Sequence, residues 1–253
     1  MTPENLRSLY LDLMRDCLTG MIYDDPPLEW NGSGVRPYDR KTREIGMDWP
    51  AQAHSMIGKK RMLQLQQAAE TVLQHAIPGD FIETGVWRGG ACILLRAVLE
   101  AYGVTDRRVW LADSFAGLPQ PDPDRYPEDR GDTLYSYRAL AVPIETVREN
   151  FARYGLLDDQ VVFLKGWFRD TLPTAPIDRL AILRLDGDLY ESTIQPLEVL
   201  YDKVSEGGFI IVDDYHIFPN CRAAVTDFRH SRGIPDVMHD IDSAAIYWRR
   251  GVE

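Results

Sequence analysis

The stretch Asp80-Phe-Ile-Glu-Thr-Gly-Val-Trp-Arg-Gly-Gly-Ala91 indicates the fold most strongly. Its first five residues have the character of a buried strand, and helical spacing begins at Gly90. Between strand and helix the chain must turn sharply and approach a ligand closely, which Gly85 and Gly89 permit because they lack a β-carbon. A strand, a glycine turn and a helix start are typical of a site for a nucleoside-type cofactor. Gly85 and Gly89 are therefore candidate cofactor-binding residues.

Strand-like runs and helical patterns alternate through the rest of the chain. The predicted strands lie at 80–84, 108–113, 160–164, 180–186 and 208–213. The predicted helices between and around them lie at about 57–75, 90–102, 144–154, 192–204 and 221–232. This βαβα order predicts a doubly wound α/β domain with a mainly parallel sheet and helices on both faces. Two further runs, 237–240 and 244–249, predict a terminal hairpin whose last strand is antiparallel to the others.

Length and composition restrict the classes of function. The 253 residues suffice for one large domain, and the net charge of −11 argues against nucleic acid as a partner. The first residues lack a signal pattern and no apolar run approaches the length of a membrane span, so we expect a cytoplasmic protein without a membrane partner. The three cysteines are widely spaced, which argues against a disulfide framework or a thiolate zinc site.

Two segments stand outside the alternating pattern. Residues 1–56 predict an N-terminal helical and lid extension, with a helix followed by a loop at 24–37 rich in proline and glycine. Residues 57–253 form the predicted main domain. Within it, residues 114–142 are a long polar connection with several prolines, which we call the lid loop. A connection of that length is typical of a lid or binding loop, with disorder as the alternative.

Acidic residues at the first two strand ends indicate the kind of cofactor. Glu83 places a negative charge in the glycine turn, which repels a pyrophosphate and favours a cationic ligand such as S-adenosylmethionine over NAD. Asp113 ends the second strand, where a carboxylate can accept the two hydroxyls of a ribose, although a turn or N-cap is an equal alternative on its own. Trp167 and Phe168 follow the third strand, where a ring can cover adenine or pack in the core.

Four aspartates follow the next two strands: Asp186 and Asp188, then Asp213 and Asp214. The carboxyl ends of parallel strands share one edge of a sheet, so these carboxylates repel one another unless a cation lies among them. Oxygen ligands favour Mg²⁺ or Ca²⁺ over zinc. The alternatives are an N-cap for one of the doublet and a turn role for Asp188. His216 lies near and is a ligand, a general base or a solvated loop residue.

At this point the chain resembles the macrocin O-methyltransferase family, which includes S-adenosylmethionine-dependent enzymes that methylate deoxysugar hydroxyls of antibiotics. The resemblance covers nearly the whole chain and rests on seven motifs. They are His54-Ser-Met-Ile-Gly, Glu83-Thr-Gly-Val-Trp-Arg-Gly-Gly-Ala, Ala112-Asp-Ser-Phe, Asn150-Phe-Ala-Arg-Tyr-Gly-Leu-Leu-Asp-Asp, Gly166-Trp-Phe, Leu185-Asp-Gly-Asp and Val212-Asp-Asp-Tyr. It implies a Rossmann-like class I methyltransferase fold with a seven-stranded sheet, and it makes a homo-oligomer plausible.

The resemblance also implies roles for residues at matching positions. Metal ligands fall on Asp186, Asp213 and Asp214, and a candidate base falls on Asp188, whereas the lysine base of catechol enzymes would fall on Leu189. The positions that match cofactor-binding residues are Met56, Ile57, Glu83, Gly85, Asp113, Ser114, Trp167 and Phe168.

The expected reaction is methyl transfer from S-adenosylmethionine to a hydroxyl of a deoxysugar in a glycosylated small molecule, with Mg²⁺ lowering the pKa of the acceptor hydroxyl. Asp188 is the preferred base, Asp186 the second and His216 the third. The alternative is a methyltransferase acting on a planar catechol or phenol. The segment after Asp213-Asp214 and residues 26–48 depart from the family pattern, so the sequence does not name the acceptor.

Overall fold

The computed structural model of the chain describes residues 2–29 and 34–252. Its strands are β1 (Asp80–Thr84), β2 (Val109–Asp113), β3 (Val161–Lys165), β4 (Leu180–Leu185), β5 (Val204–Val212), β6 (His239–Asp240) and β7 (Ile246–Arg249). Its α-helices are α1 (Pro3–Leu18), α2 (Arg40–Glu44), α3 (Gly58–Gln74), α4 (Gly90–Ala101), α5 (Ile144–Arg153), α6 (Phe168–Thr171), α7 (Tyr190–Leu200) and α8 (Pro219–Arg232).

The strands form one seven-stranded sheet in the order β3-β2-β1-β4-β5-β7-β6. The pairs from β3 to β5 are all parallel, whereas β7 runs antiparallel to both β5 and β6. The order reverses between β1 and β4, which is where doubly wound sheets bind ligands. The predicted mainly parallel sheet with an antiparallel last strand is confirmed.

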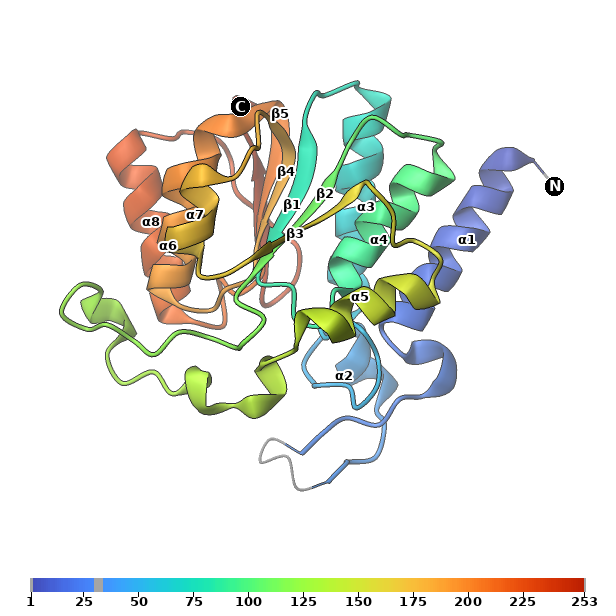
Figure 1. Cartoon of the computed structure of the whole chain (residues 1–253), viewed down its shortest axis with the longest axis horizontal. Helices are drawn as coiled ribbons and strands as arrows, with labels where there is room; N and C mark the ends of the chain where they lie inside the picture. Colours follow the sequence, from blue (N-terminus) through green and yellow to red (C-terminus); the bar gives the residue numbers. More distant parts are fainter. Residues whose placement is uncertain (1, 30–33, 253) are drawn as a thin grey trace.

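Helices cover both faces of the sheet, as Figure 1 shows. On one face α1, α3, α4 and α5 enclose a large apolar core with the inner residues of the strands. On the other face α6, α7 and α8 enclose a second core that includes Trp110 and Trp248. The central strand β4 is buried along its whole length, because helices cover it on both sides. The sheet is thus a rigid support for whatever its carboxyl edge carries.

The structure differs from the sequence prediction at α7, at β5 and in two short helices, α2 and α6. The helix expected over 192–204 begins at Tyr190 and ends at Leu200, and β5 already begins at Val204 rather than at 208. The 3-10 helix Tyr201–Lys203 lies between them and continues the helical spacing, which explains the overlong helix prediction. The short helix α2 follows the predicted loop of the N-terminal extension, at a place where no second helix was predicted, and the Asp39 side chain caps it through the Thr42 amide.

Both irregular segments lie at the carboxyl edge of the sheet. Figure 1 shows the lid loop in green at the bottom of the view, running from beneath α6 and α8 toward α5, with the blue segment before α3 on the same side. The lid loop contains three 3-10 helices, η2 (Pro127–Asp129), η3 (Leu134–Ser136) and η4 (Arg138–Leu140). Within the described residues, none of the helices combines the length and apolar character needed to span a membrane.

Candidate active site

A cavity of about 410 Å³ opens at the carboxyl edge of the sheet, a volume in the range of small-molecule sites. Residues from the N-terminal extension, the lid loop and five strand ends line it. The predicted site residues in its wall are Met56, Ile57, Glu83, Gly85, Asp113, Ser114, Trp167, Phe168, Asp186, Asp188, Asp213 and Asp214. The structure therefore brings twelve predicted residues to one cavity.

The glycine turn makes room for protein backbone. A β-carbon on Gly85 would lie 1.7 Å from the carbonyl oxygen of Asp186, so only glycine lets the ends of β1 and β4 meet. A β-carbon on Gly90 would lie 2.4 Å from the carbonyl oxygen of His54, to which the Gly90 amide donates a hydrogen bond. These glycines bring the segment before α3 and the loop after β4 to the cavity wall.

Glu83 is buried at the end of β1, where it pairs with the guanidinium of Arg184 on β4. The thiol of Cys92 on α4 donates to the other carboxylate oxygen at 2.9 Å. Burial raises the pKa of Glu83 to about 7, against the opposing charge of Arg184. The sequence assigned this negative charge to a cationic cofactor, and in the structure Arg184 neutralises part of it.

Asp113 holds together the turns that follow β1 and β2. One carboxylate oxygen accepts from the Val86 amide at 2.8 Å, and the other accepts from the Phe115 amide at 2.7 Å. Burial raises the pKa of Asp113, and these hydrogen bonds oppose the shift. These hydrogen bonds fix the Asp113 carboxylate in the cavity wall. The Ser114 hydroxyl donates to the Gly117 carbonyl at 2.6 Å and so shapes the first turn of the lid loop.

Three aspartates form the carboxylate cluster: Asp186, Asp188 and Asp214. Each offers an oxygen, and these oxygens lie within 4.8 Å of one another. Asp186 and Asp188 belong to the loop between β4 and α7, where Asp188 has the left-handed φ of 63°. Asp214 follows β5. Asp186 and Asp214 belong to the predicted ligand set, whereas the third member is Asp188 in place of Asp213.

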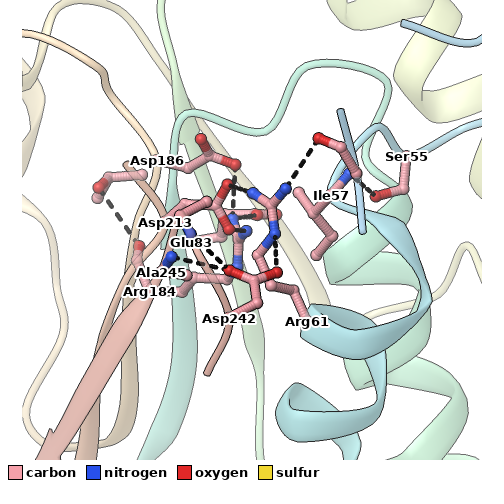
Figure 2. Close-up of polar contacts among 12 residues, drawn as sticks. Ser55, Ile57, Arg61, Glu83, Arg184, Asp186, Asp213, Asp242 and Ala245 are labelled. Atoms are coloured by element: carbon pink, nitrogen blue, oxygen red, sulfur yellow. Dashed lines mark hydrogen bonds and ion pairs between the residues drawn. The ribbon is translucent and has the colours of Figure 1, made fainter. Parts of the chain in front are cut away.

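Asp213 forms ion pairs with two buried arginines, as Figure 2 shows. Arg61 reaches it from α3 and also lies 3.2 Å from Asp242, near the C-terminal hairpin. Arg184 pairs with Asp213 and, at 2.7 Å, with Asp186. The two guanidinium groups thus take up the carboxylate of Asp213 and link it to Asp186, which explains why Asp213 stands outside the cluster.

The cluster carries more negative charge than its arginines neutralise. Burial, followed by the neighbouring carboxylates, raises the pKa of Asp188 and Asp214 well above the usual range. Burial and the charge of Asp213 also raise the pKa of Asp186. One oxygen of Asp214 is buried without a hydrogen-bond partner. A set of close carboxylate oxygens with one left unpartnered fits a hard divalent cation.

Two predicted site residues lie elsewhere in the described structure. The ring nitrogen Nε2 of His216 lies 2.8 Å from Asp240 on β6, and His216 is absent from the described cavity wall. Gly89 has φ 86° at the start of α4, and a β-carbon there would meet Val147 of α5 at 2.8 Å. Gly89 therefore makes room for a helix rather than for a ligand.

Sequence reasoning missed the two arginines and an aromatic contact in the cavity wall. Arg184 had one signal, since a charged residue inside an apolar strand needs a buried partner. Arg61 had none, because its partner Asp213 is 152 residues away. Trp49 and Tyr137 meet edge to face with their ring centroids 5.8 Å apart, and both line the cavity. This contact joins the N-terminal extension to the lid loop.

Comparisons with known proteins agree with this geometry. The family model Macrocin-O-methyltransferase (TylF) matches residues 7–250. The chain is 54% identical over 247 residues to the 8-demethyl-8-(2,3-dimethoxy-alpha-L-rhamnosyl)-tetracenomycin-C 4'-O-methyltransferase of Streptomyces olivaceus, covering 97% of this chain and 94% of that protein. It is 53% identical over 245 residues to the demethyldecarbamoylnovobiocin O-methyltransferase of Streptomyces niveus, covering 96% of this chain and 94% of that one.

A solved structure, that of the O-methyltransferase NovP, matches with a TM-score of 0.93 and 52% identity, covering 96% of this chain and 99% of that chain. The chain therefore belongs to the macrocin O-methyltransferase family and is an S-adenosylmethionine-dependent O-methyltransferase.

Proposed function

We propose that the protein methylates a hydroxyl of a deoxysugar in a glycosylated natural product of antibiotic biosynthesis, with a divalent cation, Mg²⁺, at the carboxylate cluster. The observation that carries the proposal is the meeting of three aspartate oxygens within 4.8 Å in the wall of the cavity. The name of the Streptomyces olivaceus relative, which places its 4'-O-methylation on a rhamnosyl-bearing tetracenomycin, supports the class of acceptor.

Asp186, Asp188 and Asp214 are the residues that would hold the cation, since their oxygens already converge. A bound Mg²⁺ would supply Lewis acidity, which lowers the pKa of a coordinated hydroxyl. Asp213 supports the set from outside, because Arg184 links it to Asp186. The structure thus favours a third ligand different from the one that the family resemblance implies.

Asp188 is the proposed proton acceptor. One of its carboxylate oxygens belongs to the converging set that would hold the cation, and the other would take the proton of the acceptor hydroxyl. Asp186 is the second candidate for the base, because its ion pair with Arg184 stabilises the charged form of its carboxylate and so makes it a weaker proton acceptor. The proposal assigns no role to His216, which lies with Asp240 outside the described cavity wall.

The cofactor residues orient the methyl donor. Glu83, Asp113 and the segment Met56–Ile57 line the same cavity as Asp186 to Asp188. A single displacement needs the donor carbon and the acceptor oxygen in line, and a preformed geometry supplies much of the acceleration. The Asp186 amide donates to the Thr84 carbonyl at 2.9 Å, which holds the end of β4 against the end of β1.

Leu189 occupies the position where catechol enzymes have a lysine base, and it is fully buried in the core. A planar aromatic diol therefore lacks that base here, and the sugar acceptor is the better match. Catechol remains the competitor to include in the assay.

The test is methyl transfer from S-adenosylmethionine to a panel of deoxysugar glycosides and catechol, after chelation and with Mg²⁺ restored. We expect turnover of a glycoside only with Mg²⁺, and a loss of about two orders of magnitude or more in Asp214→Asn. Asp240→Asn, which changes an exposed aspartate on β6, is the matched control.

Full turnover in chelator would refute the role of the cation. Preferential methylation of catechol would instead support the alternative acceptor. Comparing Mg²⁺ binding by Asp188→Asn and Asp213→Asn identifies the third ligand: the proposal expects the larger loss of affinity in Asp188→Asn.

A further inference from the structure

The helix α7 begins directly after the loop that carries Asp186 and Asp188, yet its own N-cap residue, Leu189, has no side-chain hydrogen bond to offer. The lid loop supplies the cap instead. One oxygen of Asp129 accepts from the Tyr190 amide at 2.7 Å, and the other accepts from the Glu191 amide at 2.9 Å. Asp129 is fully buried, although it belongs to a loop that is otherwise largely exposed.

Asp129 also reaches the next helix. The side-chain amide of Asn220, in the first turn of α8, donates to Asp129 at 2.9 Å. The adjoining Tyr126 adds a ring contact with Tyr190 at 6.0 Å and a hydrogen bond from Gln195 of α7 at 3.3 Å. One carboxylate of the lid loop thus joins the starts of α7 and α8, the two helices that it approaches in Figure 1.

Each of these helices follows one of the two loops of the carboxylate cluster. The loop before α7 holds Asp188 at a φ of 63°, a conformation that is costly for a residue with a side chain and needs support from its surroundings. The loop before α8 begins at Asp214, whose carbonyl accepts from the amide of Phe218 at 3.0 Å. The position of both loops therefore depends on where their helices start, and Asp129 fixes both starts.

We propose that Asp129 is a positioning residue for the reaction, which holds Asp188 and Asp214 at the separation that the chemistry uses and makes an ordered lid loop a condition for that separation. The inference rests on the proposed function, since it takes the carboxylate cluster as the reacting site. Asp129 acts only through the backbone amides and Asn220, so it contacts neither donor nor acceptor.

The experiment compares Asp129→Ala and Asp129→Asn in the full chain with Asp124→Ala, an exposed aspartate of the same loop. For each variant, kcat and KM for the acceptor, Mg²⁺ binding by calorimetry, S-adenosylhomocysteine binding and thermal unfolding are measured. We expect Asp129→Ala to lower kcat and Mg²⁺ affinity by about tenfold or more, as losses of residues supporting a metal site do. Affinity for S-adenosylhomocysteine should change little, because Asp129 contacts the starts of α7 and α8 and none of the predicted cofactor residues.

Asp129→Asn should recover part of both losses, because an amide oxygen still accepts one of the two backbone bonds. Asp124→Ala should behave as the wild type. A folded Asp129→Ala variant with unchanged kcat and Mg²⁺ affinity would overturn the inference. It would also be overturned if S-adenosylhomocysteine binding fell as much as Mg²⁺ binding, or if both Asp129 variants failed to fold. Either result would make Asp129 a residue of general stability.

A different set of results would refute the proposed function itself. A wild-type protein that binds no Mg²⁺ and turns over fully in chelator refutes the cation, while the kcat of Asp129→Ala still tests whether Asp129 positions Asp188. A fall in kcat with unchanged KM would then support the positioning role without the cation.

Discussion

Gly85 is the residue at which the fold tolerates an added carbon atom least. Its β-carbon would overlap the Asp186 carbonyl, and its φ of 88° is costly for any other residue. The position joins β1 to β4 and hence the cofactor side of the cavity to the acceptor side. Sequence reasoning identified the glycine but not its neighbour, because Asp186 lies about a hundred residues further along the chain.

We predict that Gly85→Ala lowers the free energy of unfolding by about 4 kcal/mol or more, the size of the severest single substitutions. Gly103→Ala is the matched control, since Gly103 also has a positive φ, of 66°, but open space around its would-be β-carbon. The free energy of unfolding of Gly103→Ala should fall by about 1 kcal/mol, from the cost of the backbone conformation alone. Denaturant unfolding of both variants measures the difference, and equal losses would contradict the overlap.

His54 gives the residue-scale prediction for pH. Its ring lies 2.9 Å from the Tyr154 hydroxyl, and burial, with the charges of Arg153 and Arg88, lowers the pKa of His54 to about 4. The unfolded chain has a histidine pKa of about 6.5 and so binds the proton first as pH falls. The folded state should therefore lose stability as pH falls from about 6.5 toward 4.

Replacing His54 by glutamine should flatten that pH dependence. The stability gap between the wild type and His54→Gln is expected to narrow between about pH 7 and about pH 5. The check is the free energy of unfolding at both pH values, with His75→Gln, at the exposed end of α3, as control. A decline in His54→Gln as steep as in the wild type would show that another group titrates.

At the scale of elements, two segments far apart in sequence meet in the wall of the cavity. The N-terminal extension contributes Trp49 and the lid loop contributes Tyr137, and their rings meet edge to face. Prolines and glycines marked both segments as loops, but propensity carries no information on which loops touch. Their meeting follows from the sheet, which brings every carboxyl-end connection to the same edge.

We predict that Trp49→Ala raises KM for the acceptor by about tenfold, since large aromatic anchors contribute much of the binding energy at such sites. Tyr135→Ala, which removes an exposed ring of the same lid loop, is the control and should leave KM unchanged. Steady-state kinetics with varied acceptor provides the measurement, and S-adenosylhomocysteine affinity should stay constant. A rise in KM in both variants alike would point to a general loosening of the lid loop.

The element boundaries show where sequence patterns stop being informative. The buried strands β1 and β4 and the helix α4 lay where predicted to within a residue or so, because apolar runs bounded by glycine or charge leave little freedom. The junction of α7 and β5 was misplaced, because a 3-10 turn has nearly helical spacing. The cap of α7 could not be predicted from local sequence, since Asp129 lies 61 residues before Tyr190, the first residue of the helix that it caps.

For the molecule as a whole, the fold followed from the alternation of strands and helices, and the gathering of acidic residues followed from the parallel sheet. The balance of charges within the site could not be predicted from the sequence. Six carboxyl groups contact or adjoin two guanidinium groups in the described structure: Glu83, Asp186, Asp188, Asp213, Asp214 and Asp242, with Arg61 and Arg184. Such pairings join α3, β1, β4 and β5, so they exist only once the sheet has formed.

Because the site forms only in the folded protein, cofactor binding should raise the free energy of unfolding. At S-adenosylhomocysteine about 100-fold above its dissociation constant, we expect about 2.7 kcal/mol of stabilisation. For a chain of this size that corresponds to a melting point about 5 to 10 °C higher. NAD should produce no shift. Thermal unfolding with each ligand measures this, and a rise with NAD alone would contradict the interpretation of Glu83 and Asp113.

The attachment of the lid loop at Asp129 suggests a way in which related enzymes could come to accept different substrates. The attachment divides the loop into two spans, 114–128 and 130–142, each with cavity-lining residues of its own: Leu118 and Pro119 in the first, and Leu134, Tyr137 and Leu140 in the second. Chimeras that exchange one span between relatives while keeping Asp129 would change the wall of the cavity without moving the helices beneath it. The same separation lets natural variation explore new acceptors one span at a time.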